Sequence, residues 1–461
     1  MKNISAQMQG YRDELLKDLA GLVRIDSVRG EPREGMPFGE GPAKALDYCM
    51  ELGKKMGFAV CNEGNRAGHV EYGEGGEILG ILAHCDVVPA GAGWTKNPFE
   101  CTVEGGRMYG RGVTDDKGPA VAALYCLKAL KDSGIKPKRR IRVIIGASEE
   151  MGMDDLPYYF AHQPMPDLAF SPDGEYPVCN REKGILHLTL THAHDGACLF
   201  SLDAGEAANV VPVAARAKAR ISAAALRRAA ENFEGAQDGA LPRFAVEAEG
   251  ENASVTARGK SAHGSTPAQG VNAALYLIRL LRACLGDETG ELCRFLDEAV
   301  GVGTDGAGLG IAVSDAESGA LTLNIGVVKI APEGDKAIVD IRYPVTKSGE
   351  AIFEKIRAAA EKFGVRAEKT SDSAPLFVPE ESELVQKLLS AYHNATGEEA
   401  HTYSSGGGTY ARELKNGVAF GACFHPCSQY NIHGADEFAE IDEFMRHCGV
   451  CLQAIYELAC L

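Results

Sequence analysis

Histidine and acidic residues follow several predicted strands of this sequence, a position from which side chains often reach a ligand or metal in open α/β sheets. His84 and Asp86 come directly after the apolar run GILA, in the string AHCDVVPAG. Because they are two residues apart, both side chains lie on the same side of an extended segment. Such a pair suits a metal ligand and the acid that orients it, and it equally suits an ordinary loop histidine.

Adjacent acidic residues occur twice. Asp115 and Asp116 stand in YGRGVTDDKGP, just ahead of a predicted helix, where acids also serve as helix caps. Glu149 and Glu150 follow the apolar strand IRVIIGAS, where solvated loop acids are the alternative interpretation. Neighbouring like charges destabilise a fold unless a cation or a proton offsets them. Both pairs are therefore candidates for a metal site.

Two further residues complete the pattern. Asp173 follows the strand DLAF in SPDGEYP, and His433 follows VAFGACF in YNIHGADE. Because open α/β sheets place ligands beyond the carboxyl ends of their strands, we expect five side chains to converge. Two histidines and three carboxylates suit zinc or manganese, and they suffice for two ions that share one carboxylate. The predicted ligands are His84, Asp115, Glu150, Asp173 and His433.

The strings HCDVVPAG, GRGVTDDKGP, ASEEMG, SPDGEYP, GKSAHGSTP and SSGGGTYAREL resemble those of the M20 family of metallopeptidases, in order and in spacing, over nearly the whole chain. The form of SPDGEYP, the GGGTYAREL loop and a long insertion are most similar to the PepV-like, carnosinase-like Xaa-His dipeptidase branch. The resemblance implies a two-metal aminoacyl dipeptidase that hydrolyses the amide bond of a dipeptide with a metal-activated water.

The resemblance also implies how the ligands divide. Asp115 would bridge two divalent ions, most simply zinc, with manganese or cobalt as alternatives. His84 and Asp173 would complete one site, and Glu150 and His433 the other.

The same resemblance assigns the catalytic roles beside the ions. Glu149 would be the general base, and Asp86 would hydrogen-bond His84 and fix its tautomer. The peptide bond between Asp115 and Asp116 is expected to be cis.

Substrate-binding residues are expected in the insertion and in the Gly-rich turn. His263, in GKSAHGSTP, resembles a lid histidine that donates to the oxyanion, although it also suits a loop before a helix. Arg342, in VDIRYP, would hold the substrate carboxylate, with a surface ion pair as the alternative. Asn209 would add a donor, and the backbone at Gly407 would approach a carboxylate closely. The histidines that match no motif are His187, His192, His194 and His425.

The elements that must position these residues indicate an α/β fold: a catalytic domain with a mixed sheet and helices on both faces, plus an inserted α+β lid domain. Apolar strands alternate with helices up to about residue 185, and half-exposed alternating strands replace them afterwards. The catalytic domain is expected at 1–185 and 376–461, and the lid at 186–375. Among the predicted elements are helices 5–25 and 438–458 and a strand at 418–424.

Composition narrows the class of protein. A formal charge of −17 over 461 residues makes a nucleic-acid or anionic-membrane partner unfavourable. The 14 scattered cysteines suit free thiols in a reducing compartment. With no apolar signal core at the start and no run long enough for a membrane span, a cytoplasmic location is expected. Because the lid of the dipeptidase branch works within one chain, we expect a monomer that acts on a small peptide.

Other functions share these features. An N-acyl amino acid deacylase, a desuccinylase or a carboxypeptidase of the M20 family would have the same ligands. A metal-dependent binding protein without catalysis would not need Glu149 beside Glu150. A two-metal phosphatase or nuclease fits the ligand types but would need a basic phosphate-binding patch, which the sequence lacks.

Overall fold

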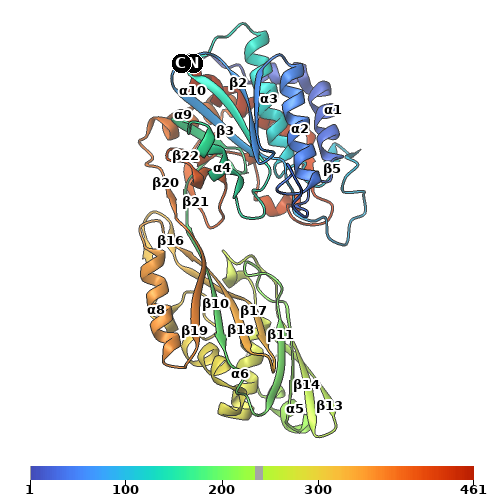
Figure 1. Ribbon diagram of the computed structural model, residues 1–461, viewed down its shortest axis with the longest axis vertical. Coiled ribbons are helices and arrows are strands. Elements are labelled where there is room, and N and C mark those ends of the chain that lie inside the picture. Colours follow the sequence, from blue (N-terminus) through green and yellow to red (C-terminus); the bar gives the residue numbers. More distant parts are fainter. Residues whose placement is uncertain (1, 234–241) are drawn as a thin grey trace. The chain divides into compact units, whose positions relative to one another are not determined.

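The computed structural model describes residues 2–233 and 242–461, which form two compact units (Figure 1). Unit 1 contains the residues up to Arg181, Leu376–Ser404 and Gly408–Leu461, and unit 2 contains Glu182–Pro375 and Ser405–Gly407. Unit 2 is thus almost entirely one insertion into unit 1, and the insertion predicted at 186–375 falls inside its bounds.

Unit 1 is built on a nine-stranded mixed sheet. Its order is β1 (Ala59–Glu63), β2 (Ala67–Tyr72), β6 (Arg140–Gly146), β3 (Ile78–His84), β7 (Leu168–Ser171), β22 (Gly417–Ala419), β9 (Val178–Glu182) and β20 (Leu376–Phe377), with β21 (Thr402–Ser405) paired to β9. Strand β3 is parallel to β6 and β7, whereas β2 pairs with β6 and β9 pairs with β22 in antiparallel fashion. The carboxyl ends of β3, β6 and β7 therefore lie at one edge.

Helices cover both faces of this sheet. Ile141, Val143 and Ile145 of β6 join one apolar cluster, whereas Ile144 joins another, because successive strand residues point to opposite faces. The first cluster includes α1 (Arg12–Val23), α2 (Glu40–Lys55), α3 (Lys117–Asp132), α9 (Glu383–Thr396) and α10 (Ile441–Ala459). The second includes α4 (Asp155–His162) and the 3₁₀ turn η7 (Tyr410–Glu413). The predicted α/β class with helices on both faces is confirmed.

Two short sheets bring distant segments of unit 1 together. One contains β4 (Thr102–Glu104), β5 (Arg107–Tyr109) and β24 (Phe438–Glu440), and the other β8 (Gly174–Glu175) and β23 (Ala422–Cys423). The pairing of β5 with β24 places the loop before α3 beside the segment that precedes α10, and the pairing of β8 with β23 places the segment after Asp173 beside Ala422.

Two predicted elements differ from the structure. The expected helix 5–25 begins as a 3₁₀ turn, η1 (Ser5–Tyr11), which contains Gly10, a weak helix former. The expected strand 418–424 is divided into β22 and β23, because Gly421 lies between them with φ 81°, outside the range of a strand.

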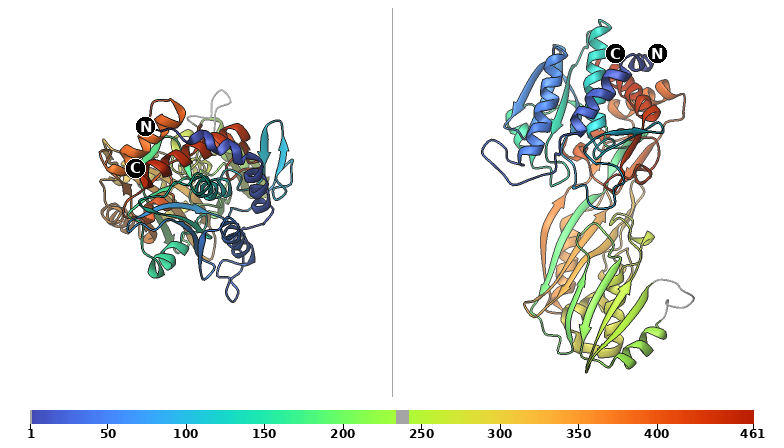
Figure 2. Two further views of the ribbon diagram at one scale, coloured as in Figure 1. Left: turned by 90° about the horizontal axis from the view of Figure 1, so that it is seen from above. Right: turned by 90° about the vertical axis from the view of Figure 1, so that its right-hand side faces the viewer.

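Unit 2 is an antiparallel sheet with helices packed on its apolar face; Figure 2 gives two further views. The strand order is β13 (Arg243–Glu249), β14 (Asn252–Arg258), β12 (Ala214–Ala219), β11 (Leu199–Ala204), β17 (Thr322–Ile330), β18 (Asp335–Tyr343), β10 (Gly184–His192) and β19 (Arg366–Ser373). Leu186, Leu188 and Leu190 of β10 are buried, and the residues between them are half-buried. The helices are α5 (Ala223–Glu231), α6 (Ala273–Leu285), α7 (Glu291–Phe295) and α8 (Gly349–Glu361).

Candidate metal centre

The structure brings the five predicted ligands together in unit 1. Donor atoms of His84, Asp115 and Asp173 lie within 4.8 Å of one another, and so do those of Asp115, Glu150 and His433. His84 ends β3, whereas Glu150 and Asp173 follow β6 and β7, so the parallel strands deliver three of the five to one edge. Asp115 belongs to both groups.

The carboxylate of Asp115 lies between the two histidines. Its Oδ1 is 3.0 Å from His84 Nε2, and its Oδ2 is 3.0 Å from His433 Nε2. His84 Nε2 is 3.9 Å from Asp173 Oδ2, and His433 Nε2 is 3.1 Å from Glu150 Oε2. One carboxylate with an oxygen directed to each group is the arrangement that a bridging ligand requires.

The close packing of acidic and imidazole groups shifts the pKa values of this cluster. Burial lowers the pKa of His433, but the carboxylates of Asp115 and Glu150 outweigh it and raise this pKa to about 11. Burial also lowers the pKa of His84, and Asp115 and Asp86 raise it well above its ordinary value. Burial and then the charge of Asp115 raise the pKa of Asp173 to about 7. A cation that bound here would replace the protons of these groups.

Glu149 lies beside this cluster with its own pKa perturbed. Burial raises the pKa of Glu149 well above its ordinary value, and the charge of Asp173 raises it further. A positive ion nearby would lower this pKa again. Glu149 is therefore a carboxyl group whose protonation depends on the charge in the centre, which suits a group that takes up and returns a proton.

Asp86 contacts His84 differently from the sequence-based expectation. His84 Nδ1 is 3.0 Å from the backbone oxygen of Asp86 and 3.5 Å from its Oδ1, so the carbonyl makes the closer contact. The carboxylate instead accepts hydrogen bonds from the backbone N–H groups of Glu149, at 3.0 Å, and Glu150, at 3.2 Å. The side chain thus fixes the turn that carries both glutamates.

Sequence reasoning missed Glu437 and Arg111. The buried carboxylate of Glu437 accepts hydrogen bonds from the backbone N–H groups of Gly112, Thr114 and Asp115 at 3.0, 3.2 and 3.3 Å. Arg111 Nη1 donates to it at 2.7 Å. Burial raises the pKa of Glu437 to about 7. This pair holds the loop that carries Asp115. The feature of the sequence that could have indicated it is Glu437, which stands in the same string, YNIHGADE, as His433.

A second set of buried acids supports the strand ends. The backbone N–H of His84 donates to Asp116 Oδ2 at 3.1 Å, and the peptide bond between Asp115 and Asp116 is cis, as the resemblance predicts. Asp155 Oδ2 accepts from the N–H groups of Ala147 and Ser148 at 2.8 and 3.0 Å, and from the Tyr410 hydroxyl. Each of these acids holds backbone next to a predicted ligand.

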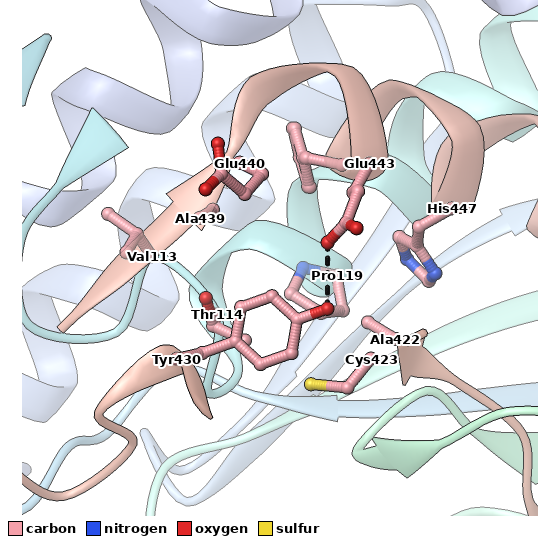
Figure 3. Close-up of a pocket in the computed structure, with 11 residues that line it drawn as sticks. Val113, Thr114, Pro119, Ala422, Cys423, Tyr430, Ala439, Glu440, Glu443 and His447 are labelled. Carbon is pink, nitrogen blue, oxygen red and sulfur yellow. Dashed lines mark hydrogen bonds between the residues drawn. The ribbon is translucent and has the colours of Figure 1, made fainter. Parts of the chain in front are cut away.

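A small cavity of unit 1 lies beside Thr114 and is shown in Figure 3. His447 and Cys423 also line it. Two further lining residues are joined by a hydrogen bond, which the Tyr430 hydroxyl donates to Glu443 Oε2 at 2.7 Å. Its volume of about 20 Å³ is room for about one water molecule. A dipeptide does not fit there.

The predicted substrate-binding residues Asn209, His263, Arg342 and Gly407 all belong to unit 2. The backbone N–H of Gly264 donates to Asn209 O at 2.7 Å, which places Asn209 beside the segment of His263. His263 Nδ1 is 2.7 Å from Ser265 Oγ, and Gly407 N donates to Ser405 Oγ at 2.9 Å.

Arg342 is buried, so the surface ion pair considered for it is wrong. Its Nε and Nη2 donate to the two oxygens of Asp340 at 2.8 and 2.9 Å, and its Nη1 donates to Gly406 O at 3.0 Å. These contacts fix the guanidinium beside the Gly-rich turn.

Comparisons with known proteins show what this chain is similar to. The sequence profile described as peptidase family M20/M25/M40 matches residues 80–457. "Putative dipeptidase YtjP" of Bacillus subtilis (strain 168) is 38% identical over 97% of this chain and 98% of its own length. A "Putative dipeptidase" of Staphylococcus aureus (strain USA300) is 34% identical over 98% of each chain. The structure of human carnosine dipeptidase 1 aligns with TM-score 0.63 at 14% identity, over 98% of both chains, and shares the fold.

Proposed function

The chain belongs to peptidase family M20/M25/M40 and is a metallopeptidase; from this premise we propose that it is an aminoacyl dipeptidase with two divalent ions in unit 1. The observation that carries the proposal is the position of Asp115, with one oxygen 3.0 Å from His84 and the other 3.0 Å from His433. The relatives named as dipeptidases support the substrate class.

The residues present fit a pair of divalent ions. Imidazole and carboxylate donors are the ligands that zinc prefers when no cysteine takes part, and manganese and cobalt accept the same set. His84 and Asp173 would hold one ion, Glu150 and His433 the other, and Asp115 both. Ions bound there would supply Lewis acidity and lower the pKa of a water molecule toward neutrality.

Glu149 is proposed as the general base. Its carboxyl would take the proton of the attacking water and return it to the leaving amine, so that proton number balances over the reaction. Two observations support this role. The backbone of Glu149 is fixed by Asp86, and burial raises the pKa of its side chain, which favours proton uptake.

The residues of unit 2 are proposed to bind the substrate. His263 would donate to the oxyanion, with Asn209 as a further donor. Arg342 and the backbone at Gly407 would face the substrate carboxylate, and the hydrogen bond from Arg342 to the Gly406 carbonyl supports their acting together. We propose that His263 acts within its own chain and that the protein is a monomer.

A cytoplasmic location is part of the proposal. It rests on the cysteines, since the 14 of the sequence are scattered along the chain in a pattern that suits a reducing compartment. Within the described residues, no helix has both the length and the apolar character of a membrane span.

The test of the function is a substrate panel assayed with metal-stripped protein. Zinc, manganese and cobalt are each added back, and hydrolysis is measured for Xaa-His and alanine-containing dipeptides, N-acetyl and N-succinyl amino acids, longer peptides and phosphoesters. The dipeptides are expected to be hydrolysed fastest, and only with metal. Hydrolysis of N-acyl amino acids alone would replace the dipeptidase proposal with a deacylase.

Glu149→Gln separates a catalyst from a binding protein. The substitution removes the proton acceptor at similar volume, so kcat is expected to fall about 10²- to 10⁴-fold while bound metal is retained. Glu399→Gln, at an exposed glutamate of unit 1, is the matched control and should leave kcat unchanged. Unchanged kcat in Glu149→Gln would reject the role of the base.

A further inference from the structure

A second group of histidine and aspartate side chains lies in unit 2, at the end of the sheet. Strand β10 ends at His192, and β18 begins at Asp335, directly opposite it in the antiparallel register. Directly paired residues of antiparallel strands have their side chains on the same face. His192 and Asp335 therefore continue the core-facing rows of Leu190 and Ala337, at the edge of the apolar cluster.

The carboxylate of Asp335 is buried and only half satisfied. Its side chain is 0% exposed, and its Oδ1 lies 2.9 Å from His194 Nδ1. Its Oδ2 is also buried and makes no direct hydrogen bond within the described part of the chain, although the backbone N–H of Ala331 lies near the carboxylate. A buried carboxylate oxygen without a partner is costly, and a cation is one group that offsets that cost.

Asp195 and His192 supply further donors beside the carboxylate of Asp335. Donor atoms of His192, Asp195 and Asp335 all lie within 4.8 Å of one another. His192 Nδ1 is 3.7 Å from Asp195 Oδ1, close to the roughly 3.3 Å between two ligands of a tetrahedral zinc. His192 Nδ1 and Asp195 Oδ1 thus need to approach by only a few tenths of an ångström to share one ion.

Two existing contacts bear on these donors. His192 Nδ1 is 2.6 Å from the backbone oxygen of Ala193, a hydrogen bond that a metal at Nδ1 would replace. Asp195 Oδ1 accepts from the backbone N–H of Glu291 at 3.1 Å, and a second lone pair of the same oxygen remains for an ion.

We propose that His192, Asp195 and Asp335 form a binding site for one divalent cation, zinc by its mixed imidazole and carboxylate donors, separate from the centre in unit 1. His194 orients the carboxylate of Asp335 through their hydrogen bond, so that Oδ2 faces the ion. The ion would tie the ends of β10 and β18 to the segment that precedes α7, which is a structural role. The inference does not depend on the proposed dipeptidase activity.

The alternative is an ion pair between protonated His194 and Asp335 with no metal. The metal site and the ion pair differ in the role of His192, which would be a ligand of the ion but takes no part in the ion pair. Zinc content of the full-length protein separates them. Metal-stripped protein is incubated with excess zinc chloride, passed through a desalting column, and analysed for zinc per chain by mass spectrometry.

Wild-type protein is expected to retain about one zinc ion more per chain than His192→Gln or Asp335→Asn. His401→Gln, at an exposed histidine of unit 1, is the matched control and should retain the wild-type amount. Asp195→Asn, whose side chain is 40% exposed in the wild type, provides a third variant if burial of Asp335 makes its variant unfold.

Equal zinc content in wild type, His192→Gln and Asp195→Asn would overturn the proposal in favour of the ion pair. Anomalous diffraction from wild-type crystals at the zinc edge should also show a peak between His192 and Asp335, and a peak elsewhere in unit 2 would overturn it as well. This outcome is distinguishable from a failure of the proposed dipeptidase function. That failure would appear as absent hydrolysis of dipeptides, whatever amount of zinc unit 2 binds.

Discussion

The fully buried side chain of Asp86 accepts, at its Oδ1, a hydrogen bond of 3.0 Å from the backbone N–H of Glu149. The other carboxylate oxygen does the same for Glu150 at 3.2 Å. A carboxylate that accepts from two consecutive amides fixes the backbone of that turn, and hydrogen bonds to a charged acceptor are the stronger kind. The positions of a predicted base and a predicted ligand therefore depend on one side chain.

Asp86→Asn is expected to lower kcat/KM about 10- to 100-fold and to weaken metal binding by a comparable factor. The asparagine side chain has one acceptor oxygen and one NH₂ group, which can only donate. One of the two backbone N–H groups would therefore lose its acceptor and face the NH₂ group. Metal affinity by titration and kcat/KM at saturating metal are the measurements. Asp203→Asn, at an exposed residue of β11, is the control. Wild-type values for both quantities would show that Asp86 does not position the glutamates.

Metal binding is expected to release protons. In the metal-free protein His433 has a pKa of about 11 and His84 one well above its ordinary value, so both are protonated at pH 7. Divalent ions bind neutral imidazole, so loading both sites at pH 7 should release at least two protons per chain, one from each histidine. Calorimetry in two buffers with different ionisation enthalpies measures that number, and His433→Gln should release about one fewer. No proton release would contradict the assignment of these histidines as ligands.

The pH dependence of metal affinity has the same cause. Protons compete with the ions at His84, at His433 and at Asp173, whose pKa is raised to about 7. Affinity is therefore expected to fall as the pH is lowered through 7. Chelator competition at pH 8 and pH 6 measures the change, and equal affinity at both values would contradict it.

The fold class and the cluster of five side chains could be predicted because they rest on local strings. Three of the five ligands end or follow apolar strands, and parallel strands bring their carboxyl ends to one edge. His84, Glu150 and Asp173 in the structure follow β3, β6 and β7 in this way. Periodicity also located the change to half-exposed strands in unit 2.

The supporting contacts could not be predicted because they join residues far apart in the sequence. Glu437 contacts Arg111 across 326 positions, and no periodicity links them. The closer contact of His84 Nδ1 with the backbone oxygen of Asp86 could not be predicted, because spacing fixes which residue is near and not which of its oxygens is already occupied. The division of strand 418–424 depends on the backbone at Gly421, which a run of apolar letters does not reveal.

Arg111→Ala is expected to destabilise the protein by about 3–5 kcal/mol, because it leaves the buried carboxylate of Glu437 without its cationic partner. Both side chains of this pair are 1% exposed. Urea denaturation followed by circular dichroism gives the change in unfolding free energy. Arg12→Ala removes an exposed ion pair with Asp442 and should change stability by less than about 1 kcal/mol. Equal losses in the two variants would show that burial does not set the cost of breaking the pair.

His447 makes the stability of unit 1 depend on pH. Burial in α10 lowers its pKa to about 3, so the folded protein keeps this side chain neutral while the unfolded chain binds a proton below about pH 6.5. The unfolded state therefore binds more protons between those values. The contribution of His447 to stability is fully present above pH 6.5 and is lost progressively as the pH falls toward 3.

From pH 7 to pH 5 this loss amounts to about 2 kcal/mol for one histidine. His447→Gln does not titrate, so its unfolding free energy should fall by about 2 kcal/mol less than that of the wild type over this interval, whatever its absolute stability. Fluorescence of Trp94, the single tryptophan of the sequence, reports the unfolding of unit 1. The exposed variant His401→Gln should follow the wild-type pH dependence. If His447→Gln follows it as well, His447 is not held neutral by its burial.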